Sequence, residues 1–344
     1  MKIAIILPNL SRNGPIFVAQ ELVCKLCNNV DLIDVYYFDD IVELSFNCNT
    51  KRISFWEKID FDKYDIIHSH MLRPDLYIYF NRKLIKKAKT FTTLHQYNYE
   101  YLKNDYNIFL SFFVSLIWTK VLKSFDKVVT LTLHMNNYYS DKGILNSNYI
   151  YNGRNISSVD HYSSIFLKYL KTKYKILGTT GLLIKRKGID QVINLLKYNL
   201  EYYLIIIGDG SDYESLLNLA VKLNVTDRCL FLGKKSNPFE FYVYFDLFVF
   251  PTRNEGMPMS LIEAAALNQT VVCSNIPVLK EIYSKDEVSF FELDNIDSLD
   301  KAVKYALNNT STLSFNLNRK YNLTQTSELM ASNYHNLYLN TINT

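Results

Sequence analysis

The sequence predicts an α/β protein made of two doubly wound units, in which parallel strands alternate with helices. Three observations support this prediction. Short β-branched and aromatic runs alternate with longer stretches of helical periodicity, a pattern typical of parallel strands joined by helical crossovers. The alternation restarts near residue 174, after a polar stretch. The length of 344 residues corresponds to roughly two domains of about 150 residues each.

The first half opens with an apolar run from Ile3 to Leu7 that Pro8 closes. This run is shorter than the roughly 7–15 apolar residues of a signal-peptide core, so it indicates a first strand. A helix with an apolar face is expected over 15–27. The further elements expected in this half are strands at 34–39, 65–70, 90–95, 127–132 and 148–153 and helices at 74–87 and 106–124.

The longest apolar stretch lies in the last of these helices, from Ile108 to Trp118. Its 11 residues cover about 16 Å at a rise of ~1.5 Å per residue, against a hydrocarbon core of ~30 Å. We therefore do not expect it to span a bilayer as a helix.

The second half repeats the pattern after a polar seam at 156–174. Its expected elements are strands at 174–182, 202–210, 229–233, 247–252 and 270–274 and helices at 188–197, 212–223 and 258–267. The asparagine-rich stretch 307–318 is expected to be a loop. The last helix carries Leu329, Met330, Tyr334, Leu337 and Tyr338 on one face, so it needs a surface to cover.

Composition excludes several classes of protein. With 48% hydrophobic residues the chain can bury a large core, which argues against global disorder. The net charge of +4 is too small for a dedicated nucleic-acid binder. This excess lies entirely in residues 1–155, which hold 19 basic and 15 acidic side chains. Five cysteines at irregular spacing indicate reduced thiols and a cytoplasmic location.

The motif Gly208-Asp209-Gly210 follows an expected strand but lacks the third glycine of a dinucleotide fingerprint. A nicotinamide or flavin enzyme is therefore disfavoured. Gly-x-Ser-x-Gly, the nucleophile motif of many serine hydrolases, is absent.

The most informative segment runs from Phe250 to Leu267. An expected strand ends at Phe250, a loop carries Glu255 and Gly256, and Pro258 suits the first position of a helix. The unpaired amides of Met257, Met259 and Ser260 would then face the loop. Because such a helix start attracts anions, a diphosphate would fit there.

Two carboxylates flank this helix start, at Glu255 and Glu263. A fully helical path would separate them by about 12 Å, which exceeds the ~5–5.5 Å or ~6.5–9.5 Å of glycosidase carboxylate pairs. They are better suited to accept hydroxyl groups at two points of one extended ligand. The alternative is a helix-capping Glu255 and a solvated Glu263.

Sequence context favours the ligand-binding interpretation. The segment 250–267 resembles the donor-binding signature of retaining GT-B glycosyltransferases of family 4. Further motifs follow the family order over nearly the whole chain: GLLIKRKGID, IIIGDGSDYESL and DRCLFLGKKS in the second half, and DIIHSH, TFTTLH and IYNGRN in the first.

This resemblance implies the GT-B fold, with two Rossmann-like domains that face each other across a cleft. Residues 1–156 would form the acceptor-side domain and residues 172–325 the donor-binding domain. The C-terminal helix, 326–344, would return to the first domain.

The resemblance also implies roles for the donor-side residues. Glu255 would accept hydrogen bonds from donor-sugar hydroxyls, and the amides after Gly256 would meet the sugar or its distal phosphate. Glu263 would hold the ribose diol, and Lys187 would neutralise the diphosphate. Gly208 belongs to the matching strand end.

One departure concerns Leu182, which stands where the family usually has arginine. Arg186 is the candidate for the second positive charge. The alternative for Arg186 and Lys187 is an exposed pair at a helix start.

On the acceptor side, His95 matches a family histidine that lies over the donor sugar. The alternative is an interior histidine with satisfied hydrogen bonds. His68 and His70 alternate on one strand and point the same way, toward helix packing or toward the cleft. Gly14 matches a glycine-bearing loop near the acceptor, or is an ordinary turn glycine.

We expect no metal or other cofactor. Asp60-Phe61-Asp62 resembles a metal clamp of the other glycosyltransferase fold, but its position before a strand favours a surface loop.

The resulting hypothesis is a cytoplasmic, retaining, metal-independent transferase of a hexose-type sugar. The donor would be a nucleotide-diphosphate sugar, with a UDP-sugar favoured. The acceptor would be a hydroxyl of a glycan or of a lipid-linked intermediate in lipopolysaccharide or polysaccharide biosynthesis. A nucleotide-sugar epimerase and a non-catalytic partner subunit are the alternatives.

Peripheral contact with the inner face of an anionic membrane is a further hypothesis. Basic side chains cluster near aromatic residues in the first half: Arg82, Lys83, Lys86, Lys87, Lys89, Lys103, Lys120 and Lys123. Such a cluster suits anionic headgroups. The alternative is a solvated helix face above a buried aromatic helix.

Overall fold

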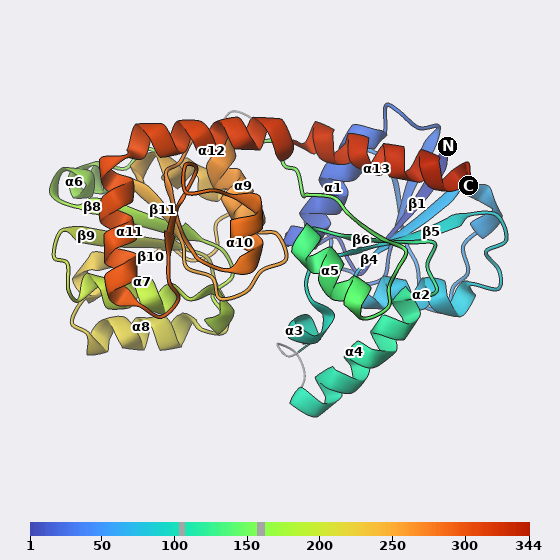
Figure 1. The fold of residues 1–344 in the computed structure, drawn as a ribbon, viewed down its shortest axis with the longest axis horizontal. Coiled ribbons are helices and arrows are strands. Elements are labelled where there is room, and N and C mark those ends of the chain that lie inside the picture. Colours follow the sequence, from blue (N-terminus) through green and yellow to red (C-terminus); the bar gives the residue numbers. More distant parts are fainter. Residues whose placement is uncertain (103–106, 157–161) are drawn as a thin grey trace. The chain divides into compact units, whose positions relative to one another are not determined.

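The structure, a computed structural model, describes residues 1–102, 107–156 and 162–344 (Figure 1). The chain forms two compact units. The first comprises Met1–Arg154 together with Thr324–Thr344, and the second comprises Asn155–Leu323.

The first unit contains a seven-stranded parallel sheet in the order β3-β2-β1-β4-β5-β6-β7. The strands are β1 (Lys2–Leu7), β2 (Leu32–Tyr37), β3 (Asn49–Arg52), β4 (Ile66–His70), β5 (Lys89–Leu94), β6 (Lys127–Thr130) and β7 (Ser147–Tyr149). The strand order reverses between β1 and β4, so the switch point at which doubly wound folds bind ligands lies between these two strands.

The helices of the first unit follow the expected alternation. They are α1 (Gly14–Leu26), α2 (Leu72–Asn81), α3 (Asn98–Leu102), α4 (Ile108–Leu122), α5 (Leu133–Asp141) and α13 (Ser327–Ile342). Side-chain caps begin several of them: Asn13 accepts a hydrogen bond from the amide of Ile16, and Asn107 accepts one from Leu110.

The C-terminal helix α13 belongs to the first unit, as the fold class predicted. It contacts α1 (Figure 1) and buries Met330, Tyr334 and Tyr338. The hydroxyl of Tyr338 lies 2.6 Å from Nδ1 of His68 on β4. Three of the five residues predicted to share the apolar face therefore cover the first unit's core, whereas Leu329 is exposed and Leu337 is partly buried.

The second unit contains a six-stranded parallel sheet in the order β10-β9-β8-β11-β12-β13. The strands are β8 (Lys175–Thr180), β9 (Tyr202–Ile207), β10 (Cys229–Phe231), β11 (Leu247–Phe250), β12 (Val271–Ser274) and β13 (Ser289–Phe291). The helices are α6 (Ile165–Lys173), α7 (Ile189–Leu196), α8 (Tyr213–Lys222), α9 (Met259–Ala266), α10 (Pro277–Ile282), α11 (Ile296–Asn308) and α12 (Thr310–Thr324). The switch point lies between β8 and β11.

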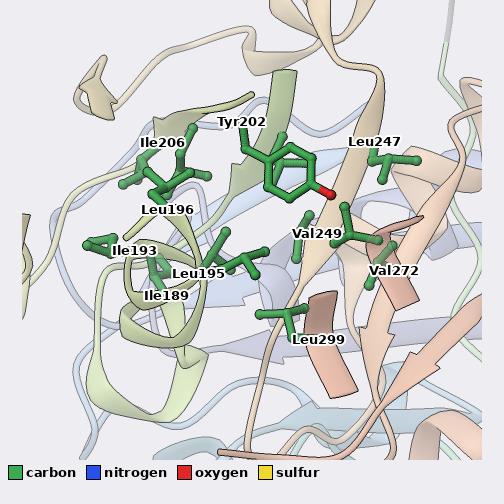
Figure 2. Packing of buried hydrophobic residues seen from close by; sticks show 14 of the residues in the cluster. Ile189, Ile193, Leu195, Leu196, Tyr202, Ile206, Leu247, Val249, Val272 and Leu299 are labelled. Atoms are coloured by element: carbon green, nitrogen blue, oxygen red, sulfur yellow. The ribbon is translucent and has the colours of Figure 1, made fainter. Parts of the chain in front are cut away.

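The core of the second unit lies between this sheet and the helices α7 and α11. Figure 2 shows Ile193 and Leu196 of α7 beside Tyr202 and Val249 of the strands, with Leu299 of α11 nearby. All five side chains are buried. This packing holds the strand ends, and so the loops that follow them, in fixed positions.

The expectation of a loop at 307–318 is wrong, because most of this stretch forms α12. Leu313, Leu317 and Tyr321 recur at helical spacing and are buried. Asn318 donates to the carbonyl oxygens of Ala265 and Ala266 at the end of α9. The asparagines are weak helix formers by propensity, but tertiary packing decides the conformation here.

Among the described residues, none of the helices has both the length and the apolar character needed to cross a bilayer.

Candidate active site

The donor-side residues gather at the switch point of the second unit, where two loops follow neighbouring strands. The loop after β8 leads through Lys187 to Gly188, and the loop after β11 begins at Pro251. Gly188 has φ of +67°, and a Cβ at this position would lie 2.1 Å from the carbonyl oxygen of Pro251. Gln191 of α7 donates to that same oxygen at 2.8 Å. Only glycine therefore lets the two loops approach so closely.

A salt bridge also connects the loop after β11 to α7. Arg253 donates to both carboxylate oxygens of Asp190 at 2.9 and 2.8 Å, in a bidentate pair. It also forms an ion pair with Asp294 at 2.6 Å. Because bidentate pairs restrict geometry as well as adding energy, the loop that carries Glu255 is held against α7.

Glu255 is the centre of the site. Its side chain is only 7% exposed, and its Oε1 receives three contacts. Lys187 Nζ lies at 2.6 Å, Arg186 Nη1 at 2.9 Å, and Thr252 donates its hydroxyl at 2.9 Å. Lys187 also lies 5.2 Å from the ring centroid of Phe250. The structure thus brings together three of the predicted residues and adds Thr252.

The site holds two cations against one carboxylate. Burial raises the pKa of Glu255, but the charges of Lys187 and Arg186 outweigh it, so the pKa is held below its usual value. Glu255 is therefore ionised at neutral pH, and one positive charge remains uncompensated within the cluster. The Nε of Arg186 is also buried without a hydrogen-bond partner among the described residues. A partly buried cation surplus of this kind suits an anionic ligand.

The sequence left two interpretations open for Arg186 and Lys187. The alternative of an exposed pair is wrong, because each side chain is only 17% exposed and both contact Glu255. Leu182, where the family has arginine, is exposed. The second positive charge beside Glu255 belongs to Arg186, four residues after Leu182.

The helix start predicted at Pro258 is present with a shift of one residue. Helix α9 begins at Met259, and Pro258 takes the capping position with φ −78° and ψ 120°. This extended ψ is typical of a residue that precedes a helix. The side chain of Pro258 makes no capping hydrogen bond to the first amides of α9, which include those of Met259 and Ser260.

The remaining donor-side residues lie around this helix start. Gly256 and Met257 are buried in the loop before α9. Glu263 lies within α9 and is buried, so the alternative of a solvated Glu263 is wrong.

Gly208, directly after β9, has φ of +154°, and a Cβ there would lie 1.8 Å from the carbonyl oxygen of Gly181. This glycine is required by contact between two strand ends, which is a structural reason independent of any ligand.

In the first unit the predicted histidines form one stack at the ends of β4 and β5. The rings of His68 and His70 lie 4.5 Å apart, and those of His70 and His95 lie 5.1 Å apart. His70 Nδ1 and His95 Nε2 are hydrogen-bonded at 2.9 Å. His68 lies under α13 and also bonds to Thr93 Oγ1 at 2.8 Å. His68 therefore serves packing, whereas His95 is only partly buried.

All three imidazoles are neutral at physiological pH. Burial lowers the pKa of His95 to about 3, and burial together with His95 lowers that of His68 to about 3. The pKa of His70 is lowered further by burial and by its two histidine neighbours. The Nε2 of His70 is buried without a hydrogen-bond partner among the described residues. A neutral stack can orient the ring of His95 and can share hydrogen bonds, but it carries no charge.

Gly14 is the first residue of α1, directly after the loop that follows β1. It lies after β1 and His70 ends β4, so the two flank the switch point of this unit. The Asp60 and Asp62 side chains are exposed on either side of Phe61. No group of three or more metal-binding side chains occurs in the part of the chain that the structure describes.

Fold and site together define the class of protein. The sequence predicted a GT-B glycosyltransferase. The structure has two tandem doubly wound sheets, each with its candidate residues at the switch point, and a partly buried cation pair on Glu255 in the loop before α9.

Comparisons with known proteins establish the family. A family model described as glycosyl transferases group 1 matches residues 164–322, and one described as glycosyltransferase family 4 matches residues 44–158. The O-antigen biosynthesis glycosyltransferase WclY of Escherichia coli is 30% identical over 352 residues, which cover 99% of this chain and 98% of the relative. The chain belongs to the family 4 glycosyltransferases.

Solved structures confirm the GT-B fold. Sucrose-phosphate synthase from Thermosynechococcus elongatus superposes with a TM-score of 0.80 at 16% identity and covers 99% of both chains. HepE of Anabaena, in complex with UDP and glucose, gives a TM-score of 0.81 at 14% identity and covers 99% of this chain and 100% of its own. At these identities the likeness concerns the fold alone.

Proposed function

We propose that this glycosyltransferase moves a sugar from a UDP-sugar to a hydroxyl of a glycan or lipid-linked acceptor in surface-polysaccharide synthesis. We further propose that it retains the anomeric configuration and needs no metal ion. The observation that carries the proposal is the cluster of Lys187, Arg186 and Glu255 at the switch point beside the start of α9.

Relatives and neighbours support the choice of donor and acceptor. WclY is named for O-antigen biosynthesis. A relative from Campylobacter jejuni, 28% identical over 215 residues, is named as a transferase acting on a diphospho-undecaprenol-linked sugar. HepE structures contain UDP-glucose, or UDP with glucose. The acceptor side of the proposal is therefore a lipid-linked or O-antigen glycan.

The cluster suits the departure of a nucleoside diphosphate. Negative charge grows on the diphosphate as the bond to the sugar breaks, and Lys187 and Arg186, which are partly buried, are proposed to stabilise that charge. The amides at the start of α9, among them those of Met259 and Ser260, add hydrogen bonds and a favourable dipole. This charge compensation replaces the metal ion of other glycosyltransferases.

Glu255 is proposed to orient the sugar. Its three contacts converge on Oε1, which leaves Oε2 as an acceptor for a sugar hydroxyl. Glu263, further along α9, is proposed to hold the ribose diol. His95, which is neutral, is proposed to hydrogen-bond the donor sugar, and His70 to orient His95. Gly14 and His70 are the acceptor-side candidates.

Retention is proposed to arise by displacement on a single face. No nucleophile is assigned for a covalent intermediate. The leaving phosphate oxygen takes the proton of the incoming hydroxyl while the new glycosidic bond forms and the bond to the diphosphate breaks. Proton NMR of the product, with a donor of known anomeric configuration, tests this point, and an inverted product would contradict it.

The first prediction concerns catalysis. Glu255→Gln lowers kcat by roughly 100-fold or more, the scale found when one stabilising group is removed from a transition state, whereas Lys187→Ala raises the KM for the donor as well. Lys222→Ala, an exposed lysine on α8, is the control and keeps wild-type transfer. Steady-state assays with a UDP-sugar measure both constants. Near-normal transfer by both site variants would refute the assignment.

The second prediction concerns metals. Because Lys187, Arg186 and the start of α9 balance the diphosphate, transfer proceeds equally with added magnesium and with an excess of chelator. A loss of transfer in chelator that added magnesium restores would contradict the proposal. The same assay without acceptor checks the donor for isomerisation, which would indicate an epimerase instead.

The nucleotide is identified by a thermal-shift screen of UDP-, GDP- and ADP-sugars. A ligand at 100 times its Kd stabilises the folded state by ~2.7 kcal/mol. We expect the largest shift from the UDP-sugars. Peripheral contact with an anionic membrane is the remaining part of the proposal, for which the exposed basic residues of the first unit give support.

A further inference from the structure

Helix α4 exposes an apolar face of unusual size. Seven of its large apolar residues are exposed to solvent, with exposed fractions between 44% and 79%. These are Ile108, Phe109, Leu110, Phe112, Phe113, Leu116 and Ile117. The alternative of a buried aromatic helix is thus wrong. Contiguous apolar patches on soluble domains usually mark a binding surface.

The opposite face of α4 packs on the protein. Ser111, Ser115 and Trp118 are buried there, as are Val121 and Leu122. Trp118 donates its indole N–H to the buried Asp75 of α2 at 2.7 Å. Asn98 of α3 donates to the carbonyl oxygen of Ser115 at 3.2 Å. These bonds set the rotation of α4, so the helix cannot turn its aromatic side inward without leaving buried polar groups unpaired.

The length of α4 restricts what can cover it. Its 15 residues extend about 22 Å, less than the ~30 Å of a hydrocarbon core. Being too short to cross, α4 can meet a bilayer only at its interface, with the exposed side toward the lipid and the other side packed on the protein. Phenylalanine and leucine are among the residues that face the apolar side of interfacial helices.

Basic side chains lie on and around α4, which indicates an anionic binding partner. The helix has no acidic residue, and Lys120 lies on the exposed face, one turn beyond Leu116 and Ile117. Lys123 follows directly and is exposed. Because β5 and β6 are parallel neighbours, the ends of the preceding helices α2 and α4 lie at the same edge of the sheet. Exposed Arg82, Lys83 and Lys86 follow α2 there.

This charge pattern favours anionic lipid over a second copy of the chain. In a symmetric dimer through α4, the basic residues of one copy would approach the like charges of the other. Anionic headgroups instead attract every one of them. Phe80 and Leu84, beside the same basic residues, are exposed as well and extend the apolar surface.

We propose that α4 is the membrane-docking element of this enzyme, with its aromatic face inserted at the interface of an anionic bilayer. Phe109, Phe113 and Ile117 enter the boundary between headgroups and acyl chains, and Lys120 contacts the headgroups. The inference rests on the proposed function in one respect, because it supposes a lipid-linked acceptor. Helix α4 belongs to the same unit as His95, and β5, α3 and α4 are consecutive elements.

The test is co-sedimentation with vesicles of phosphatidylcholine and phosphatidylglycerol. The wild-type protein binds these vesicles, binds pure phosphatidylcholine at least tenfold more weakly, and is released by high salt. Phe109→Asp/Phe113→Asp lowers binding at least tenfold. The matched control is Leu145→Asp/Leu200→Asp, which changes two residues at least as exposed but outside α4 and keeps wild-type binding.

Two further measurements make the outcome decisive. Phe109→Trp should show a blue shift of tryptophan emission on anionic vesicles. Light scattering should show the same mass for the wild-type protein and for Phe109→Asp/Phe113→Asp. Failure of the wild-type protein to bind, equal binding by the aspartate variant, or a dimer that the aspartates dissociate would overturn the proposal.

Transfer assays separate this inference from the proposed function. The aspartate variant keeps wild-type transfer to a short soluble acceptor and loses transfer to a lipid-linked acceptor in vesicles. If the wild-type protein transfers sugar but binds no vesicles, only the docking proposal fails. If it binds vesicles through α4 but transfers no sugar, the catalytic proposal fails and the docking proposal stands.

Discussion

At the scale of single residues, the site is defined by how Glu255 is neutralised. Its buried carboxylate contacts both Lys187 and Arg186, so its loss leaves two partly buried cations without a counter-charge. Breaking a fully buried ion pair costs about 3–5 kcal/mol, and the partial exposure of the two cations makes the cost smaller here. The structure therefore predicts that Glu255→Gln lowers stability as well as catalysis.

The third prediction follows from this arrangement. Glu255→Gln lowers the Tm, and UDP raises the Tm of this variant by more than it raises that of the wild-type protein, because the diphosphate replaces the missing carboxylate as counter-charge. Differential scanning fluorimetry with and without UDP measures both shifts. A smaller UDP shift in the variant would show that the diphosphate does not bind these cations.

The histidine stack makes stability depend on pH. The three imidazoles have pKa values lowered by burial in the folded state, against ~6.5 in the unfolded chain. Their contribution is complete above pH 6.5 and is lost as the pH falls toward 3. Burial raises the pKa of Asp75 to about 7, so this carboxyl holds a proton in the folded state near pH 5 and acts in the opposite direction.

The fourth prediction states the size of this effect. Near pH 5 the unfolded chain binds about two protons more than the folded one from these four groups, which corresponds to a slope of ~2.7 kcal/mol per pH unit. His70→Gln removes one of these protons and lowers the slope by ~1.4 kcal/mol per pH unit. Urea unfolding at a series of pH values measures the slope. The same slope in the variant would mean that His70 is protonated in the folded state.

At the scale of elements, the loop between β8 and α7 positions the cations, and Gly188 decides its path. Gly188 and Gly233 both have φ of +67°, but only at Gly188 would a Cβ meet the backbone; at Gly233 no described atom lies within 4 Å of it. The two glycines therefore form a matched pair. Replacing Gly233 by alanine tests the cost of the left-handed backbone alone, and replacing Gly188 tests that cost together with the steric contact.

The fifth prediction uses this pair. Gly233→Ala costs roughly 1 kcal/mol, the cost of a left-handed residue. Gly188→Ala costs more, because the loop must move away from Pro251, and it also weakens UDP binding by displacing Lys187. Chemical denaturation and calorimetric titration with UDP measure the two effects. Equal losses of stability in the two variants would show that the contact with Pro251 is not limiting.

The elements that sequence reasoning described wrongly were decided by tertiary contacts. Helix α12 forms in an asparagine-rich stretch because its apolar residues pack inward and Asn318 caps the carbonyl groups at the end of α9. For helix α4 the sequence left burial open as one of two interpretations. Its orientation follows from Trp118 and Asp75, a long-range hydrogen bond that no local pattern reveals.

At the scale of the whole molecule, the architecture was largely predictable. The alternation of strands and helices, the restart near residue 174 and the apolar face of the last helix led to the two parallel sheets and to α13. The residues around Glu255 were predictable because they lie in local motifs at strand ends. The contributions of Thr252 and of the buried Nε of Arg186 were not, since they depend on distances between loops.

The sixth prediction concerns the return of the chain to the first unit. Removal of residues 324–344 exposes the surface of α1 and leaves Nδ1 of His68 without its partner Tyr338. The shortened chain then loses the cooperative melting of the first unit, while the second unit, 155–323, melts as before. Calorimetry of chains 1–323 and 1–342 measures this difference, since Asn343 and Thr344 are exposed. Identical melting of the two chains would contradict it.

The most direct test of the central claim is calorimetric titration of UDP into the wild-type protein, Lys187→Ala and the control Lys222→Ala. If the diphosphate binds at the cation pair beside α9, Lys187→Ala raises the Kd at least tenfold and Lys222→Ala leaves it unchanged. Equal affinity in all three proteins would place the diphosphate elsewhere and would remove the basis for the proposed reaction.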